Sequence, residues 1–253
     1  MSNYNKILDN KTSLITGCNR GIGKSLVKNF AAAGSNIIAC MRKENEEFLN
    51  FKKDLEIKFK IKIDTHYFDL VDEVQIKNFY DNVNSKYEKI DVLVNNAGTI
   101  RNSLFQMTPL KNLKETFKIN FFNQIYLSQL IVKKMQKNKK GSIINVSSTS
   151  AIQGNIGRLA YASSKSSLIT ATKVMSRELG QFGIRVNSIC PGLTNTDMMV
   201  NNTDKKILSE ITERLNLKRI AEPDEIANVI AFLASDLSSY LTGENIIVDG
   251  GLT

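Results

Sequence analysis

Short apolar runs alternate with longer amphipathic segments along most of this chain. Residues 12–16 form the first run and precede a glycine-rich turn and an apolar helix that ends at Gly34, and the run at residues 36–40 follows. Apolar runs of this length are typical of strands buried on both faces, whereas longer segments with helical periodicity cover the sheet. The alternation predicts a parallel sheet with helices on both faces.

The same pattern continues to the end of the chain. Helices are predicted at about residues 44–60, 72–87, 110–137 and 223–235, and strands at 61–70, 91–95, 142–146, 184–189 and 245–248. Asn120 lies inside the long helix, where a buried side-chain amide needs a hydrogen-bond partner. A kink in the helix would explain a polar residue at this position. Residues 198–218 mix methionine, asparagine and short apolar pairs, which is typical of a mobile lid and not of a core element.

Composition limits the class of protein. The chain has 253 residues, no linker-like composition break and no repeat, which favours one domain over residues 1–253 with a lid at about 194–217. It has no apolar signal core near the N-terminus and no run of about 18 apolar residues, so we expect a soluble cytoplasmic protein without membrane partners. The three cysteines are scattered, so they indicate neither a disulfide framework nor a metal site. The chain has one histidine, His66, so the catalytic histidine of a Ser/His/Asp hydrolase would have to be His66.

Charge adds one alternative. The formal net charge is +9, and lysines cluster at positions 133–140, which is compatible with nucleic-acid binding. The lysines are spread over predicted helix surfaces, however, and no aromatic residues alternate with them as stacking platforms. We therefore expect no nucleic-acid partner.

The glycine turn Gly17-Cys-Asn-Arg-Gly21-Ile-Gly23 lies between a strand and a helix. Glycines allow the backbone to approach phosphate, and the free N–H groups at the start of a helix favour an anion. The ending Gly-Ile-Gly-Lys-Ser also resembles a P-loop, but that motif requires glycine where Cys18 stands. The spacing is G-x-x-x-G-x-G, which also differs from the common dinucleotide fingerprint G-x-G-x-x-G. The order of strand, glycine turn and helix nevertheless predicts a nucleotide-binding site.

The end of the second strand selects between the two nicotinamide cofactors. An NAD-binding fold usually has an acidic residue there, but this chain has Met41-Arg42-Lys43. Arg42, together with Arg20 in the glycine turn, is suited to clamp a 2′-phosphate, which favours NADP(H) over NAD(H). Asp69, at the end of the third strand, is placed to meet an adenine amino group, and the turn Asn96-Ala97-Gly98 is small enough to pass beneath a flat ligand.

Tyr161 and Lys165 carry the candidate chemistry. Their separation of four residues places them on one face of a helix. A neighbouring cation lowers the pKa of a phenol, which ordinarily is about 10, toward the range useful for proton transfer. The strand at residues 142–146 delivers Ser147 and Ser148 to the same edge of the sheet, where a hydroxyl is expected to touch substrate.

Seven motifs in register extend over nearly the whole chain: TGCNRGIG, NNAG, Asn120, the serine strand, YASSK, the Pro191-Gly192 turn and LTGENIIVDGG. Together they resemble the classical short-chain dehydrogenase/reductase family. The resemblance implies a single Rossmann-like, doubly wound α/β domain with a seven-stranded parallel sheet and a nicotinamide cofactor at its switch point.

The resemblance also implies site residues. The family's catalytic set falls on Asn120, Ser148, Tyr161 and Lys165; Ser148 is chosen over Ser147 because the family's serine commonly lies thirteen residues before the tyrosine. Tyr161 is then the general acid or base, Ser148 fixes the substrate oxygen, Lys165 lowers the Tyr161 pKa and binds the ribose, and Asn120 holds a water. The implied cofactor contacts, besides Arg42, are Gly17, Asn19, Arg20, Gly21, Ile22, Asp69, Leu70, Asn96, Ala97, Gly98, Tyr161, Lys165 and Thr194.

Within the family, the motifs are most similar to those of 3-oxoacyl-acyl-carrier-protein reductases. This implies an NADP(H)-dependent ketone/alcohol oxidoreductase, with a 3-oxoacyl thioester on acyl carrier protein as the first candidate substrate, and a homotetramer. Phe182 departs from the pattern, since those reductases often have a docking cation there; Lys137, Lys139 and Lys140 are possible substitutes. The alternatives are a sugar or nucleotide-sugar dehydrogenase, and a non-catalytic cofactor-sensing or nucleic-acid-binding protein.

Overall fold

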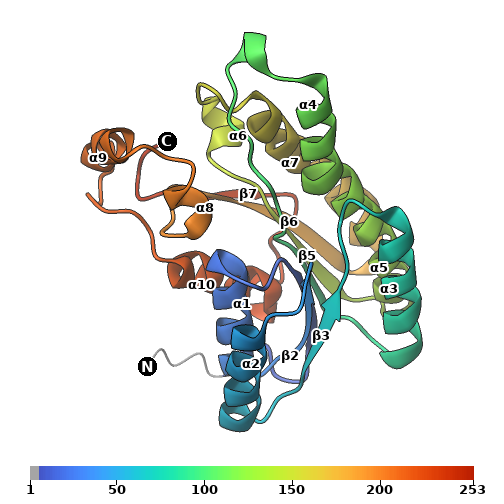
Figure 1. Cartoon of the computed structure of the whole chain (residues 1–253). Coiled ribbons are helices and arrows are strands. Elements are labelled where there is room, and N and C mark those ends of the chain that lie inside the picture. Colours follow the sequence, from blue (N-terminus) through green and yellow to red (C-terminus); the bar gives the residue numbers. More distant parts are fainter. Residues whose placement is uncertain (1–5) are drawn as a thin grey trace.

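Seven parallel strands form the centre of the protein, in the order β3-β2-β1-β4-β5-β6-β7 (Figure 1). A computed structural model describes residues 6–253, apart from the side chain of Lys205. The predicted seven-stranded parallel sheet is confirmed, and residues 1–5 of the predicted domain lie outside the described part. The strands are β1 (Thr12–Thr16), β2 (Asn36–Met41), β3 (Ile63–Tyr67), β4 (Val92–Asn95), β5 (Gly141–Val146), β6 (Ile184–Pro191) and β7 (Asn245–Val248).

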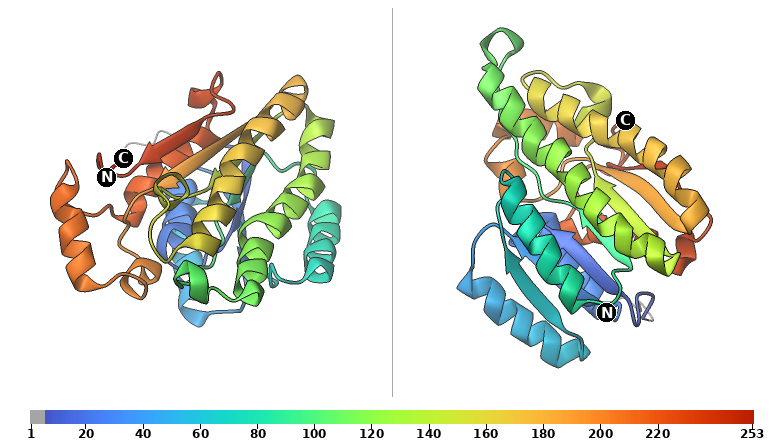
Figure 2. Two further views of the ribbon diagram at one scale, coloured as in Figure 1. Left: turned by 90° about the horizontal axis from the view of Figure 1, so that it is seen from above. Right: turned by 90° about the vertical axis from the view of Figure 1, so that its right-hand side faces the viewer.

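Helices cover both faces of the sheet (Figure 2). Helices α1, α2 and α10 pack on one face, and α3, α5 and α7 on the other, with α4 beside α7. Within residues 6–253, no helix is both long and apolar enough to span a bilayer. The helices are α1 (Gly21–Ala32), α2 (Glu46–Phe59), α3 (Glu73–Lys86), α4 (Leu110–Phe117), α5 (Asn123–Asn138), α6 (Ser150–Gln153), α7 (Leu159–Leu179), α8 (Asp197–Val200), α9 (Lys205–Arg214) and α10 (Pro223–Ala234).

The apolar runs of the sequence explain the two helical layers. Successive side chains of a strand point to opposite faces, so Ile15 packs in the core beneath α1 and α10 while its neighbour Leu14 packs in the core beneath α3 and α5. In β2, Ile37 likewise packs in the core beneath α1 and α10, and Ile38 in the core beneath α3 and α5. Because both faces are covered, the central strands need continuous apolar runs and not alternating ones.

The strand order changes direction between β1 and β4. From β1 the chain builds β2 and β3 on one side, and from β4 it builds β5, β6 and β7 on the other. Loops that leave β1 and β4 therefore part in opposite directions and open a crevice at the carboxyl edge of the sheet. This is the edge to which the glycine turn, the Asn96-Ala97-Gly98 turn and the serines after β5 are delivered.

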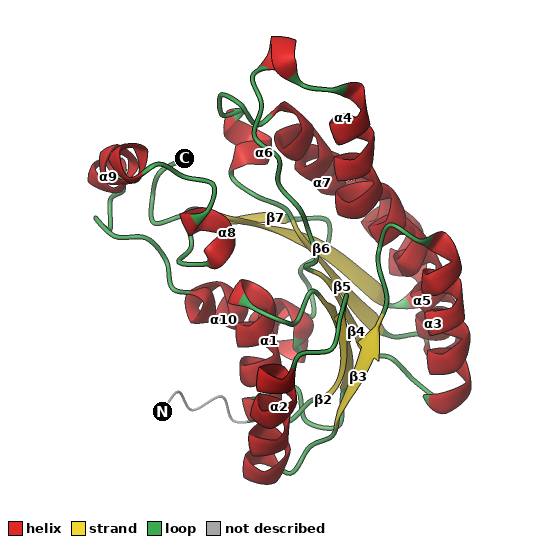
Figure 3. Cartoon of the chain, in the orientation of Figure 1, coloured by secondary structure: helices red, strands yellow, loops and turns green. Residues whose placement is uncertain are grey.

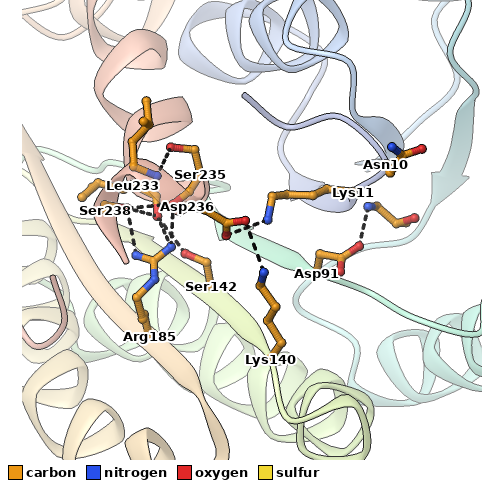
Figure 4. Close-up of polar contacts among 12 residues, drawn as sticks. Asn10, Lys11, Asp91, Lys140, Ser142, Arg185, Leu233, Ser235, Asp236 and Ser238 are labelled. Carbon is orange, nitrogen blue, oxygen red and sulfur yellow. Dashed lines mark hydrogen bonds and ion pairs between the residues drawn. The ribbon is translucent and has the colours of Figure 1, made fainter. Parts of the chain in front are cut away.

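The amino edge of the sheet is closed by a polar network around the end of α10 (Figure 4). The Arg185 guanidinium donates to the carbonyls of Leu233 and Ser235, each at 3.0 Å. Asp236 forms ion pairs with Lys11 (3.0 Å) and Lys140 (3.2 Å). These contacts satisfy helix-end carbonyls and connect α10 to β1, β5 and β6, so this edge is structural and the opposite edge is left for ligands.

Two predicted elements are shorter than expected. The strand predicted at residues 61–70 is only Ile63–Tyr67, because its single neighbour β2 ends at Met41, which pairs with Tyr67. The helix predicted at residues 110–137 is divided by a π-helical turn at Lys118–Phe122. We expected a kink around Asn120, and the structure has a π-helical turn there, which widens the helix locally.

The lid segment, residues 194–217, contains two helices that we did not predict, α8 and α9, and both lie beyond the carboxyl edge of the sheet (Figure 3). The Thr196 side chain accepts a hydrogen bond from the Met199 amide (3.3 Å), and the Asp204 side chain accepts one from the Lys206 amide (2.8 Å). These are ordinary N-caps. Met199 and Leu215 are buried, so part of the segment packs as core, contrary to the expectation of a lid without core elements.

Candidate active site

A cleft of about 1270 Å³ follows the carboxyl ends of the strands from the glycine turn to the start of α7. This exceeds the roughly 300–1,000 Å³ typical of a site for one drug-sized ligand, and it leaves room for a dinucleotide beside a second molecule. Ser148, Tyr161, Lys165 and every predicted cofactor residue line it. Asn120 lies behind the wall and is fully buried.

The glycine turn forms one end of the cleft. The amides of Gly17 and Cys18 both donate to the Cys40 carbonyl, at 2.9 and 3.2 Å, which fixes the turn against β2. Gly17 has φ +75°, a left-handed conformation that glycine adopts without strain. Helix α1 then starts without a side-chain cap and without an acidic residue in its first turn, so its free N–H groups and its dipole are available to an anion.

The two predicted arginines lie on the cleft wall beside this turn. Arg20 forms an exposed ion pair with Asp197 of the lid segment, at 3.1 Å, and such a pair contributes at most about 1 kcal/mol. Arg42 forms no ion pair among the described residues. A bound phosphate is therefore able to replace Asp197 as the partner of Arg20, and it can bind Arg42 without breaking an existing ion pair.

Asp69 is also placed at the cleft, just beyond β3. One of its carboxylate oxygens accepts a hydrogen bond from the Val71 amide at 3.0 Å, and its own amide donates to the Gln75 side chain at 2.9 Å. These local contacts fix the backbone of the turn after β3. The carboxylate keeps free acceptor positions toward the cleft.

Lys165 is the most deeply buried cation of the cleft. Only 3% of the residue is exposed, and its Nζ donates to the Val146 carbonyl at the end of β5, at 2.7 Å. Burial lowers the pKa of Lys165 to about 8. The helix is itself held by Ser147, whose hydroxyl donates to the Lys165 carbonyl at 2.8 Å.

This burial gives a stability prediction. Lowering the pKa from 10.5 to about 8 corresponds to about 3 kcal/mol of unfavourable charge burial, and Lys165→Met leaves only the Val146 carbonyl unpaired, at about 1–2 kcal/mol. We expect the cofactor-free variant to be more stable by about 1 kcal/mol at pH 7, which is about 2–4 °C in Tm. Thermal melts should show the gain, and Lys173→Met, an exposed position on the same helix, should not.

The gain should depend on pH with a definite sign. The folded pKa of Lys165 lies below the unfolded value, so the unfolded chain binds more protons between about pH 8 and 10.5. Wild-type stability then rises relative to Lys165→Met across that window, and the advantage of the variant shrinks. A variant less stable than wild type at pH 7 would contradict this account of Lys165.

Tyr161 stands one turn before Lys165, but the charge relation between them differs from the prediction. Burial raises the pKa of Tyr161, and a side-chain hydrogen bond with Ser148 and the charge of Arg158 oppose this only partly. We predicted that Lys165 lowers the Tyr161 pKa. In the structure the pKa is raised, Lys165 donates to Val146, and the opposing cation is Arg158. Tyr161 is therefore a protonated donor at neutral pH.

Asn120 supports the site from behind. Its Oδ1 accepts from the Thr99 amide (2.8 Å), and its Nδ2 donates to the Thr99 carbonyl (2.9 Å) and to the Ser164 hydroxyl (3.0 Å). The π-helical turn thus positions an amide that connects the loop after β4 to α7. Both N–H donors of the side chain are used within the protein, while Oδ1 accepts one hydrogen bond and keeps a second acceptor position.

Sequence reasoning missed three contributors to the cleft. Thr16 accepts from the Asn96 and Ala97 amides through its hydroxyl, at 3.1 and 3.0 Å, and so shapes the turn after β4. Gln124 donates to the Ala97 carbonyl. Arg158 lies three residues before Tyr161 and lines the cleft. Arg158 is the N-cap of α7 and Tyr161 its third residue, and this spacing was the available signal for Arg158.

The fold and the cleft define a class of protein: Rossmann-like oxidoreductases with a dinucleotide site at the switch point and a hydroxyl-bearing acid beside it. A family model described as enoyl-(acyl carrier protein) reductase matches residues 17–253. The chain belongs to the short-chain dehydrogenase/reductase family, which confirms the predicted family and the predicted class of oxidoreductase.

Individual relatives span almost the whole chain. The 3-oxoacyl-[acyl-carrier-protein] reductase of Thermotoga maritima is 40% identical over 246 residues, covering 97% of this chain and 98% of its own. The 7α-hydroxysteroid dehydrogenase of Escherichia coli is 32% identical over 244 residues, covering 96% and 94%. A crystal structure from Beutenbergia cavernae, assigned as an NAD(P)-dependent gluconate 5-dehydrogenase with bound NADP, has a TM-score of 0.91, 28% identity and 97% coverage of both chains.

Proposed function

We propose that this protein is an NADP(H)-dependent oxidoreductase that interconverts a ketone and a secondary alcohol, with 3-oxoacyl compounds as its substrates. The observation that carries the proposal is the meeting of Ser148, Tyr161 and Lys165 in one cleft whose other end is a glycine turn. The similarity to 3-oxoacyl-[acyl-carrier-protein] reductases over 97% of the chain supports the substrate.

The cleft fits a dinucleotide by its shape and its donors. A Cβ on Gly17 would lie 2.9 Å from the Ala97 Cα, so the glycine leaves open the narrow space where the turn meets the loop after β4. The start of α1 offers N–H groups to a pyrophosphate, Arg42 and Arg20 suit a 2′-phosphate, and Asp69 suits an adenine amino group. When bound, the nicotinamide supplies the hydride.

The residues of the chain then have separate tasks in reduction. Ser148 and Tyr161 hold the carbonyl oxygen of the substrate, and the Tyr161 hydroxyl gives its proton to that oxygen as negative charge develops. The serine assignment is supported by the contacts, because Ser147 is engaged by α7 while Ser148 faces Tyr161. Lys165 binds the ribose. Asn120 fixes α7 and holds the water that leads toward solvent.

Enoyl reductases, after which the matching family model is described, reduce a C=C bond, whereas the site of this protein favours a carbonyl. Two hydroxyl groups directed at one point stabilise and protonate an oxygen, and a C=C bond offers no oxygen at the reacting carbon. The test is NADPH oxidation with an acetoacetyl thioester and with a crotonyl thioester. We expect turnover of the first only, and turnover of the crotonyl compound alone would contradict the proposal.

Arg42 gives a prediction on cofactor choice. Arg42→Ala removes a charge-assisted contact with the 2′-phosphate, which is worth about 1.5–3 kcal/mol. We expect KM for NADPH to rise about 10- to 100-fold while KM for NADH stays within about threefold. Steady-state kinetics with both cofactors measures the ratio, with Lys53→Ala on the exposed face of α2 as control. Equal effects on NADPH and NADH would count against the arginine clamp.

The sugar-dehydrogenase alternative depended on a polar inner face of the lid segment. That face is mixed: Met198, Met199, Ile207 and Ile211 line the cleft together with Asn202, Thr203, Asp204, Glu210 and Arg214. A mixed wall does not favour a polyhydroxylated substrate. The 3-oxoacyl assignment is therefore kept.

The proposal extends to partners. An apolar groove between α5 and α7, lined by residues such as Phe121, Ile125, Val132 and Val174, supports the homotetramer that the family resemblance implies. Light scattering should give a mass near four times 28.3 kDa, and a monomer mass would contradict the tetramer.

The net charge of the chain also supports a partner protein. A charge of +9 suits an acidic acyl carrier protein, although Lys140 is already paired with Asp236.

A further inference from the structure

Arg158 lies at the substrate end of the cleft. The reaction proposed above assigns no role to this cation. It directly precedes α7, three residues before Tyr161, and it is half-buried in the cleft wall. Arg158 is the N-cap and Tyr161 the third residue of the helix, and side chains at these two positions are neighbours. A group held at Tyr161 therefore has Arg158 beside it.

The contacts of Arg158 leave most of its donors available. Its Nη2 donates to the Asn202 carbonyl, after α8, at 2.9 Å. That carbonyl also accepts from the Asn102 side chain at 3.2 Å. A guanidinium has five N–H donors in a planar fork, so the rest of the fork keeps the geometry that matches a carboxylate.

The charge of Arg158 is not compensated by an acidic side chain. Among the described residues, no ion pair involves it, and burial lowers its pKa. A half-buried cation with only a backbone carbonyl as partner lacks the paired arrangement that buried charges usually have. An anion entering the cleft supplies that partner.

We propose that Arg158 is a specificity-determining residue that binds a carboxylate of the substrate, two bonds from the carbonyl carbon that is held at Tyr161. The substrate class is then 3-oxo acids and the matching 3-hydroxy acids with a free carboxylate. This inference rests on the proposed ketone/alcohol reaction and narrows its substrate. A thioester presents a neutral oxygen at the same place and accepts a weaker bond than the charge-assisted one of a carboxylate.

The test uses acetoacetate and its methyl ester, which differ in the charge, at pH 7 with NADPH. In wild type we expect kcat/KM to favour the acid, and in Arg158→Gln we expect this preference to fall about 10- to 100-fold through KM, as loss of a charge-assisted contact predicts. Arg158→Lys should restore part of it. Arg101→Gln, an arginine outside the cleft, should leave it unchanged.

A second variant separates charge from lid attachment. Asn102→Ala removes the other donor to the Asn202 carbonyl without changing charge, so it should affect the acid and the ester equally. If Arg158→Gln also affects them equally, Arg158 only attaches the lid segment and the proposal is wrong. Calorimetric binding of acetoacetate to the enzyme loaded with NADP⁺ needs no turnover, and its loss in Arg158→Gln is expected.

The two proposals fail in different ways. A wild-type enzyme that reduces neither compound nor any 3-oxoacyl thioester would remove the reductase function, while calorimetry would still decide whether Arg158 binds the carboxylate. A wild-type enzyme that reduces the ester as well as the acid would keep the reductase function and overturn the role of Arg158.

Discussion

Replacement of Tyr161 by phenylalanine is expected to lower kcat for ketone reduction by about 10²- to 10⁴-fold, the usual worth of a positioned general acid. The variant keeps the ring and loses the hydroxyl, which shares the cleft with Ser148. Because burial raises the pKa of Tyr161, the phenol is protonated at neutral pH and is the proton donor that the variant lacks. The measurement is single-turnover reduction with saturating NADPH.

NADPH affinity and a control variant show whether the loss in kcat comes from the missing hydroxyl alone. NADPH affinity should stay within about threefold of wild type, since the hydroxyl contacts the substrate oxygen and not the phosphates. Tyr67→Phe, on the edge strand β3 and not among the residues that line the cleft, should leave kcat unchanged. A Tyr161→Phe enzyme within tenfold of wild type would remove Tyr161 as the acid.

The second large effect is expected at Gly23, in the first turn of α1. A Cβ there would lie 1.9 Å from the Gly17 carbonyl oxygen and 2.8 Å from the Gly17 carbonyl carbon. Both atoms are backbone, so Gly23→Ala can fit only if the glycine turn moves. We expect a loss of about 3 kcal/mol in the free energy of unfolding, at the upper end of ordinary overpacking, and a loss of NADPH binding of at least about 100-fold.

A matched glycine controls for the substitution itself. Gly180 follows α7 with a negative φ, and a Cβ there would meet no atom within 4 Å, so Gly180→Ala should be close to neutral. Urea unfolding and fluorescence titration with NADPH measure both effects. A Gly23→Ala protein that binds NADPH as Gly180→Ala does would contradict the close contact between the two parts of the turn.

The predicted elements were accurate where the local pattern has a single interpretation. Strand β1 (Thr12–Thr16) and strand β7 (Asn245–Val248) have the predicted bounds, because a short apolar run beside glycine leaves few other structures. Strand β3 was predicted too long because its end depends on the length of β2, a partner distant in sequence. Helices α8 and α9 were missed because their apolar pattern is weak, so that the N-caps Thr196 and Asp204 are their main signal in the sequence.

The candidate site shows the same division. Motif order was enough to bring Ser148, Tyr161 and Lys165 to one cleft, since strand ends and helix starts share one edge of a parallel sheet. The partners of each side chain were not predictable, because they depend on reach and burial in three dimensions. Lys165 extends to the Val146 carbonyl, and Arg158 acts on Tyr161 in the place expected for Lys165.

Transfer of deuterium tests the central claim most directly. NADPH that carries deuterium at the transferable position of its nicotinamide is incubated with the wild-type enzyme and a 3-oxo substrate, and the alcohol product is analysed by mass spectrometry. The account predicts one deuterium on the carbon that bears the new hydroxyl group. Oxidation of NADPH without label at that carbon, or with label on a reduced C=C bond, would contradict it.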